Sequence, residues 1–411
     1  MNRWIYIARR LSLNGDGERT TVNRAVAITT IAIAVAVMIV SLCVTTGFKR
    51  TIEGKLYGLV PHIEVYDAWM PSLGDSAMIN INDVRSVVNA DPKMRACITS
   101  VTGTMIEPLM LKTEHDFEAL QLRGVDRDYD GEYLAGCIVD GTMPSPTDTT
   151  AIILSETVAD RLSLNVGERV NAYFAVNGIK VRKLTVVGVF NTQLDAFDRM
   201  TAIGNKALLE VMTGSDTTRC HTVEITLKDP VESEAVAISL YAALMVNADS
   251  SQQYTMVPVT MKHRSFFAWL DMLDTNVAVI IVLMLIVSCF AVISTLLMIV
   301  LRRTRTIGLL KALGTGNAGV RTVFIAMTAK VVVQAMVIGN VLAITLMLLQ
   351  QHFHIIKLDP VSYYMNSVPV VIPVGEILLL NLGFIAVALL ALWLPSTIVS
   401  RVQPGASMRV E

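Results

Sequence analysis

The most strongly apolar part of the chain is the run from Val277 to Leu301, which ends abruptly at Arg302 and Arg303. At about 1.5 Å per residue, a helix of this length crosses a hydrocarbon layer of roughly 30 Å with some tilt. An arginine at the centre of a bilayer costs about 2.5–3.5 kcal/mol, so the arginines mark the end of the span. The pattern therefore predicts a transmembrane helix over residues 276–301.

Three further apolar runs predict transmembrane helices over residues 25–46, 320–349 and 376–398. Arginines precede the first span and follow the second, and the positive-inside rule places both of these ends in the cytoplasm. With four spans, both terminal segments, residues 1–24 and 399–411, are then expected in the cytoplasm.

Between the first two spans, residues 47–275 have the mixed composition of a soluble protein, and roughly 230 residues are enough for one sizeable domain. His62–Tyr66 alternates like a strand, and Asn82–Val88 begins with a capping residue and has a helical pattern. We therefore predict an α-helical membrane protein with four transmembrane helices and a large periplasmic α+β domain between helices 1 and 2. Residues 350–375 form a short periplasmic loop in this topology.

Other segments of the middle region give more local signals. Ala151–Leu154 is typical of a buried strand, and Ser155 is placed to cap the helix that follows it. Two strand-like runs, residues 169–174 and 180–190, are joined at Asn177-Gly178, which is a strong hairpin signal. These signals favour a sheet with mainly antiparallel pairs.

The second span is followed by a short amphipathic segment within residues 302–319. Ile307, Leu310 and Leu313 recur at helical spacing, and Gly314 is placed to end the helix. Because so short a helix is unstable alone, we expect it to require a partner surface.

Aromatic residues mark the two ends of the predicted soluble domain. Phe266, Phe267 and Trp269 precede the second span, and Phe48 follows the first. Aromatic side chains are enriched where membrane meets water, so these four are candidates for contact with the membrane interface or with a cargo. A packing cluster inside the soluble domain is the alternative for the group before the second span.

The composition and motifs exclude several classes of function. Lys and Arg number 34 against 35 Asp and Glu, which argues against nucleic-acid binding, and the mean hydropathy of +0.54 is too high for an ordinary soluble enzyme. The acidic turn Asp126–Gly131 copies the opening of a calcium loop, but Cys137 occupies the position that needs a glutamate. His352 and His354 have no further metal ligand nearby beyond Asp359. We expect no metal, no bound cofactor and no enzymatic activity.

No phosphate-binding P-loop occurs in the chain, so any ATP hydrolysis must take place in another subunit. The predicted spans are also poor in ionisable residues, which argues against a proton- or sodium-driven pathway. A hydrophobic or lipid-anchored cargo, or no cargo at all, is consistent with such spans.

Several blocks of sequence, which together cover most of the chain, follow one another in a recognisable order. They are Ala25–Val65, Leu122–Asp126, Ile153–Gly167, Val187–Phe190 with Asp195 and Asp198, Thr304–Gly314, and Leu394-Pro395 with Gln403–Arg409. These blocks resemble the permease subunits of the lipoprotein-releasing ABC transporters. Those transporters belong to a wider group that includes the macrolide exporter and the cell-division permease.

The resemblance implies that the short helix after the second span docks on a separate ATPase. The coupling residues implied are Arg305, Thr306, Ile307, Gly308, Leu309, Leu310, Lys311, Ala312, Leu313 and Gly314. Thr306 stands where the family usually has glutamate, so a charge pairing made by that glutamate is lost or replaced here.

The resemblance also implies a set of partners. The first is an ABC-type ATPase in two copies, and ATP and Mg²⁺ act in that subunit. The others are a second permease chain of the same or a related sequence, a lipoprotein cargo and a periplasmic carrier. The hairpin at Asn177-Gly178 is shorter than the hook of chaperone-recruiting subunits, which argues against direct recruitment by this chain. The implied activity is extraction of lipoproteins from the inner membrane.

Two alternatives remain open at the level of the sequence. One is a regulatory permease that controls a periplasmic cell-wall hydrolase. The other is mechanotransmission for drug or toxin efflux. The long outward domain favours the lipoprotein-releasing function over the regulatory one.

Overall fold

The chain is described from a computed structural model. It covers residues 18–68, 77–129, 131–145, 148–176, 178–247, 253–359 and 363–400, with the backbone alone at 18–23, 305 and 394–400. The contacts divide the chain into two units. The helical unit is Met1–Arg50, Leu270–Lys357 and Ser367–Glu411, and the sheet unit is Thr51–Trp269 and Leu358–Asn366.

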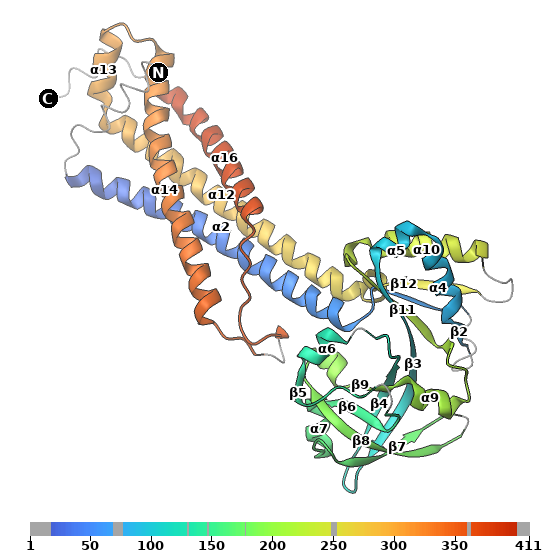
Figure 1. Cartoon of the computed structure of the whole chain (residues 1–411). Coiled ribbons are helices and arrows are strands. Elements are labelled where there is room, and N and C mark those ends of the chain that lie inside the picture. Colours follow the sequence, from blue (N-terminus) through green and yellow to red (C-terminus); the bar gives the residue numbers. More distant parts are fainter. Residues whose placement is uncertain are drawn as a thin grey trace. The chain divides into compact units, whose positions relative to one another are not determined.

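Four long helices run through the helical unit (Figure 1). They are α2 (Glu18–Leu59), α12 (Arg264–Arg302), α14 (Asn317–Phe353) and α16 (Val374–Ser400). Within the described part of the chain, four helices are long and apolar enough to cross a membrane. The predicted fold class, with a large domain between the first two of these helices, is confirmed.

The helices extend beyond the apolar runs from which they were predicted. α2 continues past residue 46, and its buried side chains Ile52, Leu56 and Leu59 recur at helical spacing. α12 begins at Arg264, before the predicted start at 276. Outside lipid a helix needs only one buried apolar stripe, so polar residues become frequent in the sequence before the helix itself ends. The two predicted boundaries of the soluble domain, at residues 47 and 275, therefore lie inside α2 and α12.

The other two spans also extend slightly beyond their predicted bounds of 320–349 and 376–398, as α14 and α16 show. The predicted tail at 401–411 and residues 1–17 of the N-terminal segment lie outside the described residues.

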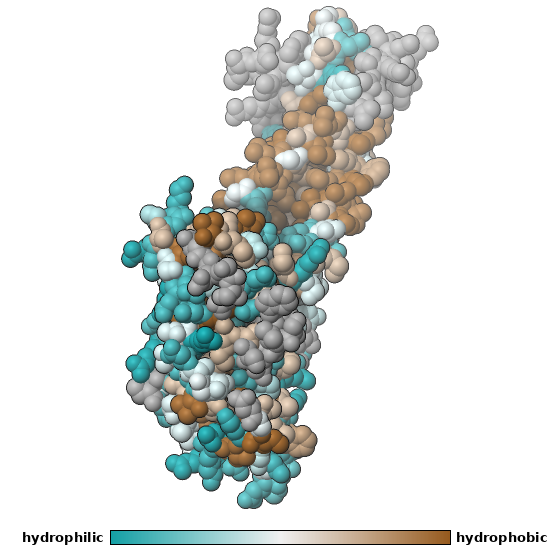
Figure 2. Space-filling view, turned by 90° about the vertical axis from the view of Figure 1, so that its right-hand side faces the viewer, coloured by the Kyte–Doolittle hydropathy of each residue, from teal (hydrophilic) through white to brown (hydrophobic). Residues whose placement is uncertain are grey.

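One apolar stripe from each long helix forms the core of the helical unit. It includes Ile39 of α2, Val292 and Leu296 of α12, Phe324 of α14 and Phe384 of α16. A Cβ added to Gly339 would lie 2.6 Å from the Ala32 carbonyl oxygen, so α14 and α2 meet there backbone to backbone. Figure 2 shows apolar side chains covering the visible face of this unit and mainly polar ones over the sheet unit.

The sheet unit is built from twelve described strands. They are β1 (Ile63–Asp67), β2 (Ile79–Asn80), β3 (Ile98–Lys112), β4 (Phe117–Val125), β5 (Ile138–Gly141), β6 (Ala151–Ser155), β7 (Arg169–Phe174), β8 (Lys180–Phe190), β9 (Thr201–Asn205), β10 (Arg219–Cys220), β11 (Thr222–Leu227) and β12 (Tyr254–Pro258). The main sheet has the order β12-β1-β11-β3-β4-β9-β6-β8-β5, and β7 pairs with both β3 and β8.

Short helices pack around these strands. They are α4 (Ile81–Ala90), α5 (Pro92–Cys97), α6 (Glu132–Gly136), α7 (Glu156–Leu162), α8 (Asp195–Asp198), α9 (Lys206–Thr213), the 3₁₀ turn Pro230–Glu232, α10 (Ser233–Asn247) and α11 (Val259–Lys262).

The sheet unit contains two lobes that share strand β3. In the barrel lobe the pairs β3–β4, β4–β9, β9–β6, β6–β8, β8–β7 and β7–β3 close a ring around buried side chains such as Leu122, Leu154 and Phe174. In the second lobe, β12, β1, β11 and the first half of β3 pack with α4 and α10 around Val65, Val84 and Leu240. Residues 98–104 of β3 pair with β11, and residues 105–112 pair with β4.

The local predictions in this unit are mostly confirmed. β1, β6, β7 and β8 lie where the pattern placed strands, and the Ser155 hydroxyl caps α7 by accepting the Val158 N–H at 3.2 Å. The cap of α4 is Asn80 and not Asn82, because the Asn80 side chain accepts the Asn82 N–H at 3.0 Å. In the β7–β8 hairpin Gly178 has a φ of +99°, whereas Asn177 lies outside the described residues.

Candidate functional site

Helix α13 (Thr304–Ala312) lies between α12 and α14 in the chain, and glycine ends it as predicted. The Gly314 N–H donates to the Lys311 carbonyl and the Thr315 N–H donates to the Leu310 carbonyl, both at 3.0 Å. Gly314 has a φ of +83°, a left-handed conformation that favours glycine. Together these features form a Schellman cap.

The apolar side chains of α13 face two directions. Ile307 is fully buried, and Leu310 is half-buried against the core of the helical unit. Leu309 is 61% exposed and Leu313 is 75% exposed. The prediction that Leu313 shares a face with Ile307 and Leu310 is therefore wrong, because Leu313 lies beyond the last helical residue, one turn from Leu309. Leu309 and Leu313 form what we call the outer face of α13.

The remaining predicted coupling residues surround these two faces. Gly308 is buried, Thr306 and Lys311 are half-buried, and Ala312 and Gly314 are exposed. Arg305 belongs to α13 by its backbone, and its side chain lies outside the described part of the structure. Part of the partner surface that so short a helix requires is thus provided by its own helical unit, and the described residues of the chain leave the outer face exposed.

The aromatic residues before the second span form a packed cluster. The ring centroids of Phe266 and Phe267 are 6.1 Å apart, and those of Phe266 and Trp269 are 6.0 Å apart. Tyr57, which the sequence did not single out, joins the cluster with its ring 6.0 Å from Phe267. Phe48 is half-buried on the part of α2 that belongs to the helical unit. The structure therefore brings three of the four predicted aromatics together as a packing cluster.

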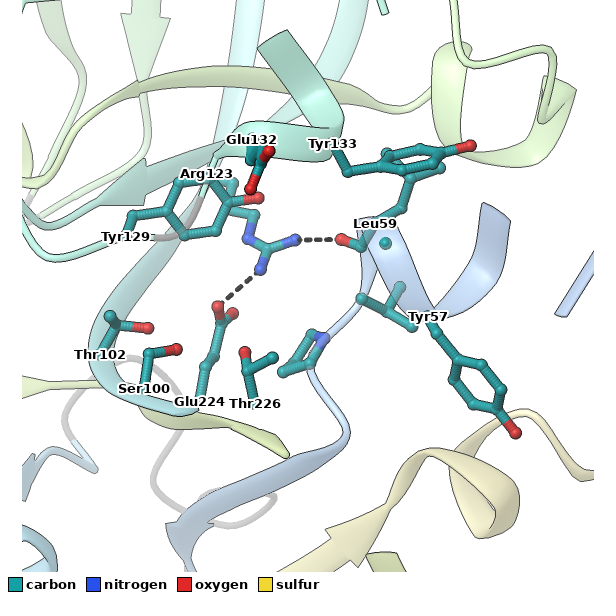
Figure 3. A pocket seen from close by; sticks show the side chains of 13 residues that line it. Tyr57, Leu59, Ser100, Thr102, Arg123, Tyr129, Glu132, Tyr133, Glu224 and Thr226 are labelled. Carbon is teal, nitrogen blue, oxygen red and sulfur yellow. Dashed lines mark hydrogen bonds and ion pairs between the residues drawn. The ribbon is translucent and has the colours of Figure 1, made fainter. Parts of the chain in front are cut away.

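A second site, which the sequence analysis missed, is a cavity of about 400 Å³ at the end of α2 (Figure 3). The guanidinium of Arg123, from β4, lies at its centre and points between α2 and β11. One nitrogen, Nη2, donates to Glu224 Oε2 at 2.6 Å, and Nη1 donates to the Leu59 carbonyl at 3.2 Å. The Arg123 and Glu224 side chains are both almost fully buried.

The electrostatics of this cavity keep Arg123 charged. Burial by itself lowers the pKa of the Arg123 guanidinium, but the Glu224 carboxylate beside it outweighs that effect, so the pKa is raised. The Tyr129 ring centroid lies 5.5 Å from Arg123 Cζ, within the range of a cation–π contact.

Tyr133 of α6 packs on the backbone of α2 at the same cavity. A Cβ added to Gly58 would lie 2.4 Å from Tyr133 Cγ, so only glycine fits against this ring. Burial raises the pKa of Tyr133 to about 12.

The sequence contained one signal that could have indicated this cavity. Arg123 is a charged residue flanked by apolar residues in the block Leu122–Asp126.

Among the described residues, no three His, Cys, Asp or Glu side chains gather in a way that could hold a metal ion. The acidic turn makes ion pairs instead. Asp128 pairs with Arg85 at 3.1 Å, and Asp126 Oδ2 lies 3.8 Å from Lys206 Nζ. Asp130 lies outside the described part of the chain.

Two protein families match this chain, one for each region. Residues 25–242 match the MacB-like periplasmic core domain, and residues 278–404 match the FtsX-like permease C-terminal region. The first match includes most of α2 and most of the sheet unit, with the Arg123 cavity. The second includes α13, α14 and α16.

Two relatives are similar to most of the chain. The lipoprotein-releasing system transmembrane protein LolC of Neisseria meningitidis serogroup B is 23% identical over 412 residues, covering 94% of each chain. LolE of Haemophilus influenzae is 21% identical over 394 residues, covering 91% of each chain.

Two solved structures are similar to part of the chain at 15% sequence identity. The periplasmic region of MacB from Actinobacillus actinomycetemcomitans has a TM-score of 0.36, covering 50% of this chain and 91% of that chain. The extracellular domain of the noncanonic ABC-type transporter YknZ from Gram-positive bacteria has a TM-score of 0.35, covering 47% and 98%.

The resemblance seen in the sequence blocks is thus confirmed over nearly the full length of lipoprotein-releasing system proteins. Because its match over residues 25–242 spans more than half of the 411 residues, the chain belongs to the family of the MacB-like periplasmic core domain, here followed by an FtsX-like permease region.

Proposed function

We propose that this chain is the membrane subunit of an ABC transporter that extracts lipoproteins from the inner membrane for delivery toward the outer membrane. The observation that carries the proposal is the outer face of α13. Leu309 and Leu313 are exposed on a capped helix whose other side packs into the core of the helical unit. Paired apolar side chains on a fixed helix suit docking against a partner protein.

In this proposal the partner is an ABC-type ATPase in two copies, which binds ATP and Mg²⁺ and docks on residues 305–314. Movement of the ATPase displaces α13. Because Ile307 and Leu310 pack into the same core as α12 and α14, that displacement reaches the long helices. α13 and both termini are then cytoplasmic, and the sheet unit is periplasmic.

The cargo assignment follows the full-length similarity to lipoprotein-releasing proteins and is supported by energetics. Each methylene withdrawn from a bilayer costs about 0.8 kcal/mol, so removal of several acyl chains requires a driven step. The exposed side chains Leu283, Ile286 and Phe290 of α12 offer an apolar surface for lipid or for a second permease chain. Phe48, Phe266, Phe267 and Trp269 stay candidates for contact with the cargo or the membrane interface, and a periplasmic carrier receives the cargo.

The docking assignment is tested by charging the outer face of α13. We expect Leu309→Asp to reduce co-purification of the ATPase with the full chain at least about tenfold, which corresponds to roughly 1.4 kcal/mol. The matched control is Val211→Asp, an exposed apolar position on α9 of the sheet unit, which we expect to retain the ATPase. Full retention of the ATPase by Leu309→Asp would refute the docking role. Leu310→Asp is a poorer test because Leu310 packs into the core.

The cargo assignment is tested by depleting the protein and fractionating the membranes. We expect acylated lipoproteins to accumulate in the inner membrane. Normal lipoprotein sorting after depletion would overturn the assignment and favour either a regulatory permease acting on a cell-wall hydrolase or mechanotransmission for drug or toxin efflux.

A further inference from the structure

The end of α2 is completed by a side chain from the sheet. The last carbonyls of a helix have no partner within the helix and must be satisfied elsewhere. The Val60 N–H still donates to the Leu56 carbonyl at 3.0 Å, whereas the Leu59 carbonyl accepts from Arg123 Nη1. A strand residue 64 positions away in sequence therefore caps the helix.

Other residues of the same sheet unit hold the segment 55–62, which we call the α2 terminus. Lys55 Nζ donates to the Gln193 side chain and to the Tyr364 carbonyl, both at 2.6 Å. The Tyr57 ring packs against Phe267, with centroids 6.0 Å apart. The α2 terminus is thus fixed in the sheet unit by hydrogen bonds and by a ring contact.

Arg123 also connects the two lobes of the sheet unit. It lies opposite Ile106 on β3, in the barrel lobe, whereas Glu224 of β11 lies opposite Thr102 of the same strand, in the second lobe. The 2.6 Å contact between Arg123 and Glu224 therefore crosses the junction between the lobes. One guanidinium joins the α2 terminus, the barrel lobe and the second lobe.

Stability alone does not require an ion pair at this position. Buried ion pairs are often replaced by well-packed apolar residues at no loss of stability. What the guanidinium adds is a rigid, planar fork whose donors set the relative positions of several acceptors. The adjoining cavity, lined by Ser100, Thr102 and Thr226 among others, leaves room for this group to shift without deforming a close-packed core.

We propose that Arg123 is a positioning residue that passes a displacement of α2 to both lobes of the sheet unit at once. α2 is a continuous helix from Glu18 to Leu59, so a movement of its membrane portion reaches Leu59 and the guanidinium. Through Glu224 the movement then reaches β11 in the second lobe, and through the backbone of β4 it reaches the barrel lobe. This inference rests on the proposed function, in which the ATPase moves the long helices.

The test uses the double variant Arg123→Met with Glu224→Leu in the full chain, reconstituted with its ATPase in proteoliposomes that contain a lipoprotein. Removing both charges leaves no unpaired buried ion, so the fold is retained. The matched control is Arg161→Met with Glu118→Leu, which removes a 2.7 Å pair between α7 and the beginning of β4. We expect the double variant to hydrolyse ATP within twofold of wild type but to release at least tenfold less lipoprotein per ATP, and the control to match wild type.

A second measurement tests the contact of Arg123 with Leu59 and Glu224, which we call the Arg123 joint, separately from the transport function. Hydrogen–deuterium exchange of the full chain in detergent needs no ATPase. We expect amides of the α2 terminus to exchange at least tenfold faster in the double variant than in wild type or the control, with equal exchange in the buried strand β6. Unchanged exchange at residues 55–62 would overturn the joint, as would an unchanged amount of lipoprotein released per ATP. If wild type releases no lipoprotein while exchange at residues 55–62 rises in the double variant, the proposed function is refuted and the Arg123 joint is supported.

Discussion

The two units of this protein use opposite kinds of polar contact to join their elements. In the sheet unit, the contact at the junction of the lobes is the ion pair of Arg123 and Glu224, at 2.6 Å. In the helical unit, the carboxamides of Asn340 on α14 and Asn381 on α16 exchange two hydrogen bonds, each at 2.9 Å. One contact carries two full charges and the other carries none.

The difference follows from the surroundings in which each unit exists. A charge at the centre of a bilayer costs several kcal/mol, so polar groups that join helices there are usually neutral and small. A domain surrounded by water can hold a buried charge if an opposite charge and hydrogen bonds meet it. The exposed apolar side chains of the helical unit fit the same surroundings. Leu283 and Phe290 of α12, for example, are more than half exposed. In lipid that exposure carries no penalty.

The largest effect that tests this comparison is expected from Arg123→Leu alone. This change leaves the Glu224 carboxylate buried without its cation, which costs about 3–5 kcal/mol of the free energy of unfolding. Urea unfolding of the full chain in detergent, followed by the circular dichroism of the sheet, measures it. The control is Arg123→Leu combined with Glu224→Leu, which we expect to recover most of the loss. A single variant no less stable than the double would contradict the charge argument.

A smaller effect is expected from Asn340→Leu in the helical unit. The change removes a neutral hydrogen-bonded pair and leaves Asn381 able to find other partners, so the expected cost is about 0.6 kcal/mol and at most about 1.7. Unfolding in mixed detergent micelles with increasing dodecyl sulfate measures it. Asn340→Leu combined with Asn381→Leu should cost little more. If Asn340→Leu were as costly as Arg123→Leu, the contrast between the units would break down.

The smallest effect concerns pH and sharpens the description of the sheet unit. Burial lowers the pKa of His62 below its ordinary value of 6.5, and its Nδ1 accepts the Leu227 N–H at 2.8 Å. Below pH 6.5 the unfolded chain binds a proton that the folded chain excludes. The stabilisation is therefore complete above pH 6.5 and is lost as the pH falls toward the folded pKa.

The pH profile of the unfolding midpoint in urea measures this contribution. We expect His62→Gln to flatten the profile below pH 6.5, because glutamine does not titrate. An identical slope in wild type and His62→Gln would show that other groups cause the pH dependence.

Local patterns predicted much of this structure correctly. The long apolar runs predicted four membrane-spanning helices because a helix in lipid must be apolar along its length. Gly314 predicted the end of α13 because its left-handed backbone conformation is unfavourable for other residues. Ser155 predicted the start of α7 through its hydroxyl. Each of these signals lies within a few residues of the feature that it predicts.

The errors arose where a distant part of the chain decides the outcome. Leu313 was expected to share one face of α13 with Ile307 and Leu310, but packing against the other helices places Ile307 and Leu310 inside and leaves Leu313 exposed. The apolar run predicted a span over residues 25–46, and it gave no sign that contacts in the sheet unit stabilise the helix as far as Leu59. Periodicity alone does not identify which apolar stripe finds a partner.

By itself, the sequence determined which segments are long and apolar enough to cross a membrane, where several helices begin or end, and that no P-loop accompanies them. Only the tertiary structure decided that Leu59, Arg123 and Glu224 meet at one point, and that Asn340 faces Asn381. The physical reason is that helix and strand patterns depend on near neighbours, whereas a buried polar contact depends on which distant elements pack together. The joint at Arg123 is such a contact.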